Sequence, residues 1–255
     1  MSLLKVDQMT QNFGGLQAVS DFNIELEGGE LIALIGPNGA GKTTIFNLVS
    51  GFYTPTKGSI TFAGKDTRGL KPHQVTALGI ARTFQNIRLW KDMNVLDNIR
   101  VAQHYRMGYS VWDSFLRTKR YNEREKEIEN IAWELLEAMN LKEYAYEVPP
   151  NLPYGLQRRV EIARAMSIQP KLLLLDEPAA GLNSSDVEEL IDLVRWIHET
   201  YKISIWMIEH QMKVVMSLCS WIKVVDFGQT IAEGTPEDIQ ANPKVIKAYL
   251  GDDTI

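Results

Sequence analysis

With 255 residues, the chain is within the size of one α/β domain and is long enough to bury a substantial core. Its 45% apolar and 23% charged residues exclude a collagen-like or largely disordered protein. The formal net charge of -5 provides no general attraction to nucleic acid, which makes nucleic-acid binding a minority hypothesis.

The single cysteine, Cys219, cannot form an internal disulfide, and the N-terminus lacks the basic and then apolar pattern of a secretory signal. We therefore expect a chain that works in a reducing cytosol. The apolar runs at 31–35 and 172–175 are much shorter than the roughly 18 residues of a membrane-spanning helix. Membrane contact is therefore expected only through partners.

The first third of the chain contains short strand patterns separated by turn residues. Apolar stretches at 22–26 and 31–35 flank a Glu-Gly-Gly-Glu turn, and a third at 60–62 follows Lys57-Gly58. We expect these three strands to form one small β-rich layer.

The middle of the chain changes to a helical pattern. Apolar residues between Ile128 and Met139 recur at helical spacing among charged residues, which predicts an amphipathic helix within a helical insertion from about Gln85 to Gln157. The apolar runs at 172–175 and 203–208 then suit buried strands of a parallel sheet. Finally, Thr235 followed by Pro-Glu-Asp has the N-cap, first-turn proline and acidic residues of a helix start.

The most specific motif directly follows the strand at 31–35. It matches G-x-x-x-x-G-K-[ST] and consists of Gly36-Pro37-Asn38-Gly39-Ala40-Gly41-Lys42-Thr43, with Thr44 ending the loop. Glycines let the backbone approach phosphate oxygens, so that N–H groups and the next helix N-terminus face the anion. Lys42 is expected to reach the β and γ phosphates of ATP, and Thr43 to give a hydroxyl to Mg²⁺. The alternative is a glycine turn without a ligand.

A second motif ends the apolar run at 172–175 with Asp176 and Glu177. Ligands of open α/β sheets bind at the carboxyl edge, where these two carboxylates are expected. Asp176 suits the Mg²⁺ shell, and Glu177 suits orientation or deprotonation of the attacking water. Alone the pattern is weak, because many strands leave a core through acidic residues; beside the phosphate loop, residues 36–44, it predicts an ATP-hydrolysing site.

Between these motifs lies Leu152-Pro153-Tyr154-Gly155-Leu156-Gln157-Arg158-Arg159, which resembles the signature of ATP-binding subunits of ABC transporters. The resemblance covers essentially the whole chain. It implies an α/β P-loop NTPase fold with a RecA-like core, an antiparallel β subdomain and an α-helical subdomain at about 86–157. The ATPase domain would span 1–238, followed by a C-terminal helix and tail at 239–255.

The resemblance also implies a head-to-tail dimer, in which each ATP lies between one phosphate loop and the partner's signature. Within that signature, Pro153, Tyr154 and Gly155 are the expected contacts, and Asn183 belongs to a loop that crosses the interface. Family signatures commonly carry serine where this chain has Pro153, so a hydroxyl donor to phosphate is missing. This is either a harmless variation or an attenuated site.

Three further roles come from the resemblance. Phe13 resembles the aromatic residue that stacks on adenine, Gln85 the glutamine that links the Mg²⁺ and water site to the membrane subunits, and His210 the histidine that contacts the γ phosphate. The alternatives are a core aromatic for Phe13, a solvated polar residue for Gln85 and an incidental surface histidine for His210.

Within the family, the sequence is most similar to the longer ATPase subunit of branched-chain amino acid importers, as seen in Tyr154 to Arg164, in Asp176 to Asn183 and in the closing segment from Gly234 to Gly251. The implied partners are two transmembrane permease subunits, a second ATPase or second copy, and indirectly an external binding protein, with the chain peripheral on the inner face of the membrane. Alternatives are related ATPases for urea, short amides or lipopolysaccharide. A soluble ABC ATPase acting on DNA or ribosomes and a phosphate-loop kinase or GTPase are less favoured.

Overall fold

The computed structural model describes residues 2–106 and 108–250, so positions 251–255 of the expected C-terminal tail lie outside the described residues. The chain divides into two compact units, one from Met1–Gln85 with Lys171–Ile255 and the other from Asn86–Pro170. The domain boundary at 238 and the helical segment at about 86–157 stay predictions.

The larger unit is built on a six-stranded sheet. Its strands, in spatial order, are β10 (Gln229–Gly234), β9 (Trp221–Asp226), β3 (Leu31–Ile35), β8 (Ser204–Ile208), β7 (Leu172–Asp176) and β6 (Ile80–Arg82). All pairs are parallel except β10 with β9. Every side chain of β3, β7 and β8 is buried, as the continuous apolar runs predict for a sheet covered on both faces.

A second sheet of the larger unit is antiparallel. In spatial order it contains β2 (Leu16–Leu26), β1 (Leu4–Phe13), β4 (Lys57–Phe62) and β5 (Lys65–Asp66). The expectation of one layer holding the strands at 22–26, 31–35 and 60–62 is therefore wrong, because the strand at 31–35 is β3 of the parallel sheet. A strand with five buried side chains in succession needs cover on both faces, which the antiparallel sheet does not give it.

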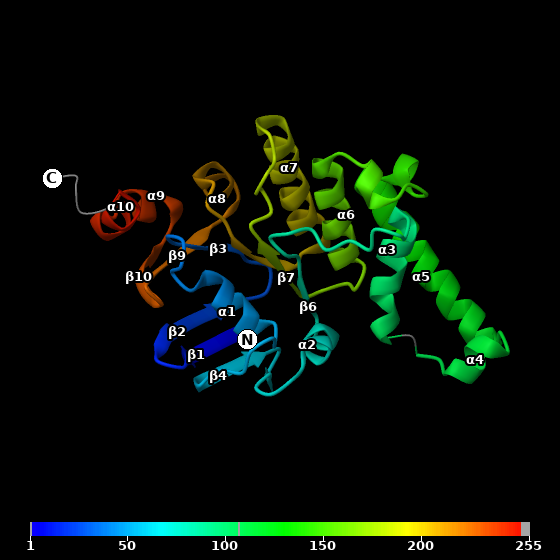
Figure 1. Ribbon diagram of the computed structural model, residues 1–255, viewed down its shortest axis with the longest axis horizontal. Coiled ribbons are helices and arrows are strands. Elements are labelled where there is room, and N and C mark those ends of the chain that lie inside the picture. The colour runs from blue at the N-terminus through cyan, green and yellow to red at the C-terminus, as the bar shows by residue number, and fades with distance from the viewer. Residues whose placement is uncertain (1, 107, 251–255) are drawn as a thin grey trace. The chain divides into compact units, whose positions relative to one another are not determined.

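Helix α1 (Lys42–Val49) lies between the two sheets, while α7 (Ser184–Tyr201) and α8 (Met212–Leu218) lie on the opposite face of the parallel sheet (Figure 1). Three rings hold this core together. The ring centroid of Trp206 on β8 lies 6.3 Å from that of Phe22 on β2 and 5.1 Å from that of Phe46 on α1. The packing fixes α1, and with it the loop that precedes α1.

The remaining helices of the larger unit are α2 (Pro72–Leu78), α9 (Pro236–Gln240) and α10 (Pro243–Leu250). The predicted helix start at Thr235 is confirmed, because its side chain accepts a hydrogen bond from the backbone N–H of Asp238. Cys219 directly follows α8 and is buried, which raises the pKa of its thiol.

The smaller unit is helical. It contains α3 (Val95–Ala102), α4 (Val111–Phe115), α5 (Lys119–Ala138) and α6 (Tyr154–Met166), with short 3₁₀ turns at Gln103–Arg106, Lys142–Tyr144 and Pro149–Asn151. The predicted amphipathic helix is confirmed as α5, whose buried face includes Ile128, Ala132 and Leu136. Among the residues that the structure describes, no helix has both the length and the apolar character needed to cross a bilayer.

Candidate nucleotide-binding site

The phosphate loop joins the end of β3 to the start of α1. Its conformation needs glycine at two crowded positions. A Cβ atom at Gly36 would lie 2.0 Å from the backbone oxygen of Val225, and one at Gly41, where φ is +101°, would lie 2.5 Å from the backbone oxygen of Ala18. The sequence pattern G-x-x-x-x-G-K therefore reflects backbone packing against β9 and β2 as well as access to an anion.

The Lys42 ammonium lies within the phosphate loop. Its Nζ donates to the backbone oxygens of Gly36 at 2.7 Å and Pro37 at 2.8 Å. Burial lowers the pKa of Lys42, while the nearby Glu177 and Asp176 carboxylates oppose that change. The loop thus holds a cation beside two acidic side chains.

Glu177 is the centre of a hydrogen-bonded triad with Gln85 and His210. Nε2 of Gln85 donates to Oε2 of Glu177 at 2.7 Å, and Nε2 of His210 lies 3.0 Å from Oε1. Glu177 has a left-handed φ of 48°, and its N–H donates to the backbone oxygen of Ile208 at 2.9 Å. The structure therefore brings together three residues that are far apart in the sequence, at the carboxyl edge of the parallel sheet.

Asp176 is the last residue of β7 and is almost completely buried. Its Oδ2 lies 2.7 Å from Nη2 of Arg82, the last residue of β6, and the two side chains are 4% and 6% exposed. Sequence reasoning missed Arg82. The available signal was an arginine that directly follows the apolar residues Ile80 and Ala81. An arginine that enters the core with such a strand needs an acidic partner, because burying an unpaired charge is unfavourable.

A cavity of about 670 Å³ brings most of the predicted residues to one place. Phe13 lies on the edge of this cavity, and its ring centroid is 5.2 Å from that of Tyr53. Because its side chain is 41% exposed, Phe13 is not a core aromatic. The predicted residues that line the cavity are Phe13, Asn38, Gly39, Ala40, Gly41, Lys42, Thr43, Thr44, Gln85, Glu177 and His210.

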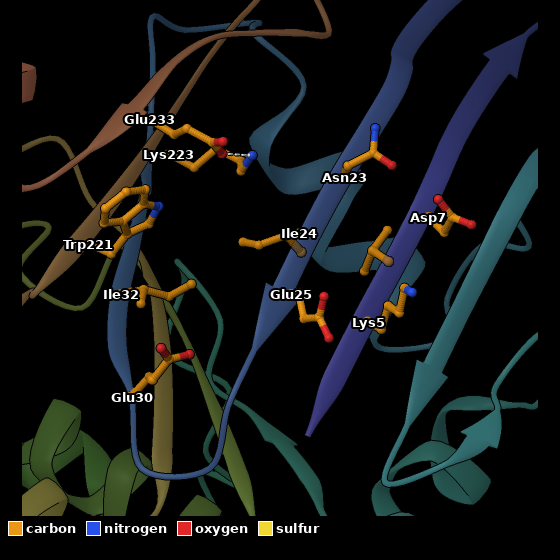
Figure 2. A pocket seen from close by; sticks show the side chains of 11 residues that line it. Lys5, Asp7, Asn23, Ile24, Glu25, Glu30, Ile32, Trp221, Lys223 and Glu233 are labelled. Atoms are coloured by element: carbon orange, nitrogen blue, oxygen red, sulfur yellow. Dashed lines mark hydrogen bonds and ion pairs between the residues drawn. The ribbon is translucent and has the colours of Figure 1, made fainter. Parts of the chain in front are cut away.

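A second cavity of about 460 Å³ lies between strands of the two sheets, and Figure 2 shows its lining. Charges of both signs surround it, including Lys5, Glu25 and an ion pair of Lys223 with Glu233. It contains no residue of the phosphate loop and neither Asp176 nor Glu177. The nucleotide chemistry therefore belongs to the larger cavity.

The signature and Asn183 lie at helix N-termini. Pro153 is the N-cap residue of α6 and provides no side-chain cap, and Tyr154 and Gly155 are the first residues of that helix. Asn183 caps α7 by accepting a hydrogen bond from the N–H of Asp186 at 2.9 Å, and it does not line the 670 Å³ cavity. Pro153, Tyr154 and Gly155 belong to the smaller unit.

The donor atoms near the phosphate loop suit Mg²⁺. Thr43, Gln85 and Asp176 offer a hydroxyl, an amide oxygen and a carboxylate, which are the hard oxygen ligands that this ion prefers. In the described part of the chain, no cluster of three His, Cys, Asp or Glu side chains is placed to hold a metal.

Comparisons with known proteins agree with this geometry. The family model described as "ABC transporter" matches residues 19–180, and that of the "Branched-chain amino acid ATP-binding cassette transporter" matches residues 229–254. The chain is 44% identical to the high-affinity branched-chain amino acid transport ATP-binding protein BraF of Pseudomonas aeruginosa, and the match covers 98% of each chain. It is 45% identical, with the same coverage, to LivG of Escherichia coli, which carries the same description.

Solved structures give the same result. The chain resembles a nucleotide-free ATP-binding cassette from an ABC transporter with a TM-score of 0.85 and 29% identity, covering 99% of this chain and 100% of that one. An ADP conformation of such a cassette matches with the same TM-score, identity and coverage. From its fold, its phosphate loop and these matches, the chain belongs to the ATP-binding proteins of the ABC transporter family.

Proposed function

We propose that this chain is the ATP-hydrolysing subunit of a membrane importer for branched-chain amino acids. The observation that carries the proposal is similarity along 98% of the chain to BraF and LivG, both described as high-affinity branched-chain amino acid transport ATP-binding proteins. The C-terminal match to a branched-chain amino acid family model supports the same substrate class. These matches do not favour the urea, amide and lipopolysaccharide alternatives.

The chain's own residues account for ATP binding. The phosphate-loop amides and the N-terminus of α1 provide donors for phosphate oxygens, and Lys42 would exchange a carbonyl acceptor for a β or γ phosphate oxygen. Phe13, on the edge of the cavity, would stack on adenine. Thr43, Gln85 and Asp176 would hold Mg²⁺, which, when bound with ATP, neutralises charge on the phosphates.

Glu177 is the residue that would act on water. Gln85 and His210 hold its two carboxylate oxygens at 2.7 and 3.0 Å, so the orientation of the Glu177 side chain is restricted. Entry of a γ phosphate would give His210 a second acceptor, and Glu177 would then orient or deprotonate the attacking water. Gln85 is the last residue of the first segment of the larger unit. It would pass the change in these hydrogen bonds to the membrane subunits.

The working assembly follows from this role. The chain would form a nucleotide-binding dimer with a second ATPase subunit or with a second copy of itself. It would lie on the inner face of the membrane, bound to two permease subunits that receive substrate from an external binding protein. ATP binding would close the dimer and hydrolysis would reopen it.

Copurification from membranes, followed by reconstitution into vesicles, tests the function. We expect two hydrophobic subunits to copurify, and vesicles to accumulate leucine, isoleucine or valine only with ATP and Mg²⁺. ATP hydrolysis with uptake of urea instead would contradict the substrate class alone. Recovery with ribosomes or DNA, without permeases, would contradict the transport role, and failure to bind or hydrolyse ATP with the true partners would contradict the ATPase assignment.

A further inference from the structure

Arg82 connects two parts of the nucleotide site that the sequence motifs treat separately. Its Nη2 donates to Oδ2 of Asp176 at 2.7 Å. Its Nη1 donates to Oδ1 of Asn47 and to Oγ of Ser50, both at 2.8 Å. One guanidinium therefore joins the carboxylate at the end of β7 to the helix that follows the phosphate loop.

The Arg82 contacts, Asn47 on α1 and its C-cap residue Ser50, lie on the same face as the predicted metal ligand Thr43. Thr43, Asn47 and Ser50 are spaced at i, i+4 and i+7, and such residues follow one stripe along a helix. Arg82 thus holds Asp176 against the stripe that begins at Thr43. The two oxygen donors expected to share Mg²⁺ come from different elements, and Arg82 contacts both of these elements.

The surroundings of Arg82 make this connection rigid. Its guanidinium carbon lies 5.6, 5.8 and 5.1 Å from the ring centroids of Phe46, Phe52 and Phe84. Aromatic rings attract the planar cation and restrict its rotation. Because Phe84 directly precedes Gln85, the same cluster also reaches the segment that contacts Glu177.

Fold stability alone is a poor explanation for this ion pair. Both side chains are 6% exposed or less, and at such burial the loss of hydration offsets much of the attraction between the charges. Replacing a buried ion pair by apolar residues often leaves fold stability unchanged or raises it. A buried ion pair is therefore more useful for fixing the position of a functional group than for stabilising the fold. Asp176 is such a group.

We propose that Arg82 is a positioning residue of the Mg²⁺ site: it orients the Asp176 carboxylate and keeps it in register with Thr43. The proposal rests on the proposed ATPase function. Arg82 does not contact the nucleotide in this scheme. It sets how well the site holds the ion that accompanies ATP, as residues behind metal ligands commonly do.

The test compares Arg82→Lys with the unchanged chain, using Mn²⁺ as a paramagnetic probe in the presence of ATP. Lysine keeps the charge but lacks the fork that contacts Asp176, Asn47 and Ser50 together. We expect Mn²⁺ affinity in the ternary complex to fall about tenfold or more. Binding of a fluorescent ATP analogue in EDTA should stay unchanged, because no phosphate contact is lost. Arg68→Lys is the matched control, since its pair with Asp66 is 3.5 Å long and over half exposed.

Ser50→Ala provides a milder variant that leaves the ion pair intact and removes one Arg82 contact. We expect a smaller decrease in Mn²⁺ affinity in the same direction. Lower melting temperatures of Arg82→Lys and Ser50→Ala with unchanged Mn²⁺ affinity would show a purely structural role and overturn the proposal. If Arg82→Lys does not fold, unchanged Mn²⁺ affinity in Ser50→Ala has the same consequence. An unchanged chain that binds no ATP would instead overturn the proposed function.

Discussion

Nε2 of His210 lies 3.0 Å from Oε1 of Glu177, whose other carboxylate oxygen accepts a hydrogen bond from Gln85. Each of the three residues follows a different strand of the parallel sheet, namely β8, β7 and β6. The carboxylate is therefore restrained from two sides. In the proposed mechanism, Glu177 would act on water from this restrained orientation.

Glu177→Gln should keep ATP affinity while hydrolysis falls at least about 100-fold, because the amide keeps the shape of the carboxylate but cannot accept a proton from water. An ATP-bound dimer should accumulate. Phosphate release and size-exclusion chromatography with ATP measure the two effects. Glu188→Gln is the control, since that carboxylate is 55% exposed and paired with Lys213. Unimpaired turnover would remove Glu177 from the water-activating role.

His210→Ala should lower the hydrolysis rate with little change in ATP affinity, because it releases one oxygen of Glu177 and removes the expected γ-phosphate contact. Steady-state ATPase assays and equilibrium binding separate the two quantities. The exposed His73 provides a matched His→Ala control. A variant with full activity would indicate that His210 is an incidental surface histidine.

Lys42→Ala should weaken ATP binding by about 10- to 100-fold, because it removes the charged donor expected to contact the phosphates. Hydrogen bonds from a charged donor contribute about 1.5–3 kcal/mol, which corresponds to this change in affinity. Titration with a fluorescent ATP analogue measures it. Lys65→Ala, on the exposed edge strand β5, should bind ATP normally. Equal affinities for Lys42→Ala and the unchanged chain would refute the phosphate-loop assignment.

Pro153→Ser should leave ATPase activity unchanged or raise it, because serine restores the phosphate donor common in the family. Serine is also a preferred N-cap residue, whereas Pro153 provides no side-chain cap for α6. The serine variant should therefore be about 1 kcal/mol more stable than Pro153→Ala, as measured by denaturant unfolding. A large loss of ATPase activity in Pro153→Ser would show that the proline itself is required.

Glu161→Ala should reduce the free energy of unfolding by about 3–5 kcal/mol, because it leaves Arg158 charged in the core of the smaller unit. The two side chains are 2.6 Å apart and 1% exposed. Asp192→Ala is the matched control, since its i,i+3 pair with Arg195 is exposed and should contribute less than about 1 kcal/mol. Similar losses of unfolding free energy in Glu161→Ala and Asp192→Ala would contradict the larger contribution expected of the buried pair.

Local patterns predicted much of this structure. The phosphate loop, the apolar runs that became β3 and β7, and the periodicity that became α5 each carry their signal within a few consecutive residues. The pairing of β3 was predicted wrongly because it depends on β8 and β9, which lie far along the chain. The three-residue strand β6 is too short to show a period, so the ion pair of Arg82 with Asp176 appears only in three dimensions.

The site residues also divide into those predicted from local motifs and those whose contacts depend on the order of strands in the sheet. Lys42, Thr43, Asp176 and Glu177 follow from motifs whose chemistry is local. The contacts of Glu177 with Gln85 and His210 depend on sheet order, because parallel strands bring their carboxyl ends to one edge whatever their separation in the sequence.

The burial of Cys219 has a practical consequence. It is the chain's single cysteine and is 5% exposed, and its raised pKa disfavours the thiolate that reacts with maleimides. A cysteine introduced at a surface position would therefore be labelled selectively without removal of the native one. Pairs of such labels, one in each compact unit, would report by resonance energy transfer how the units rearrange during the ATP cycle.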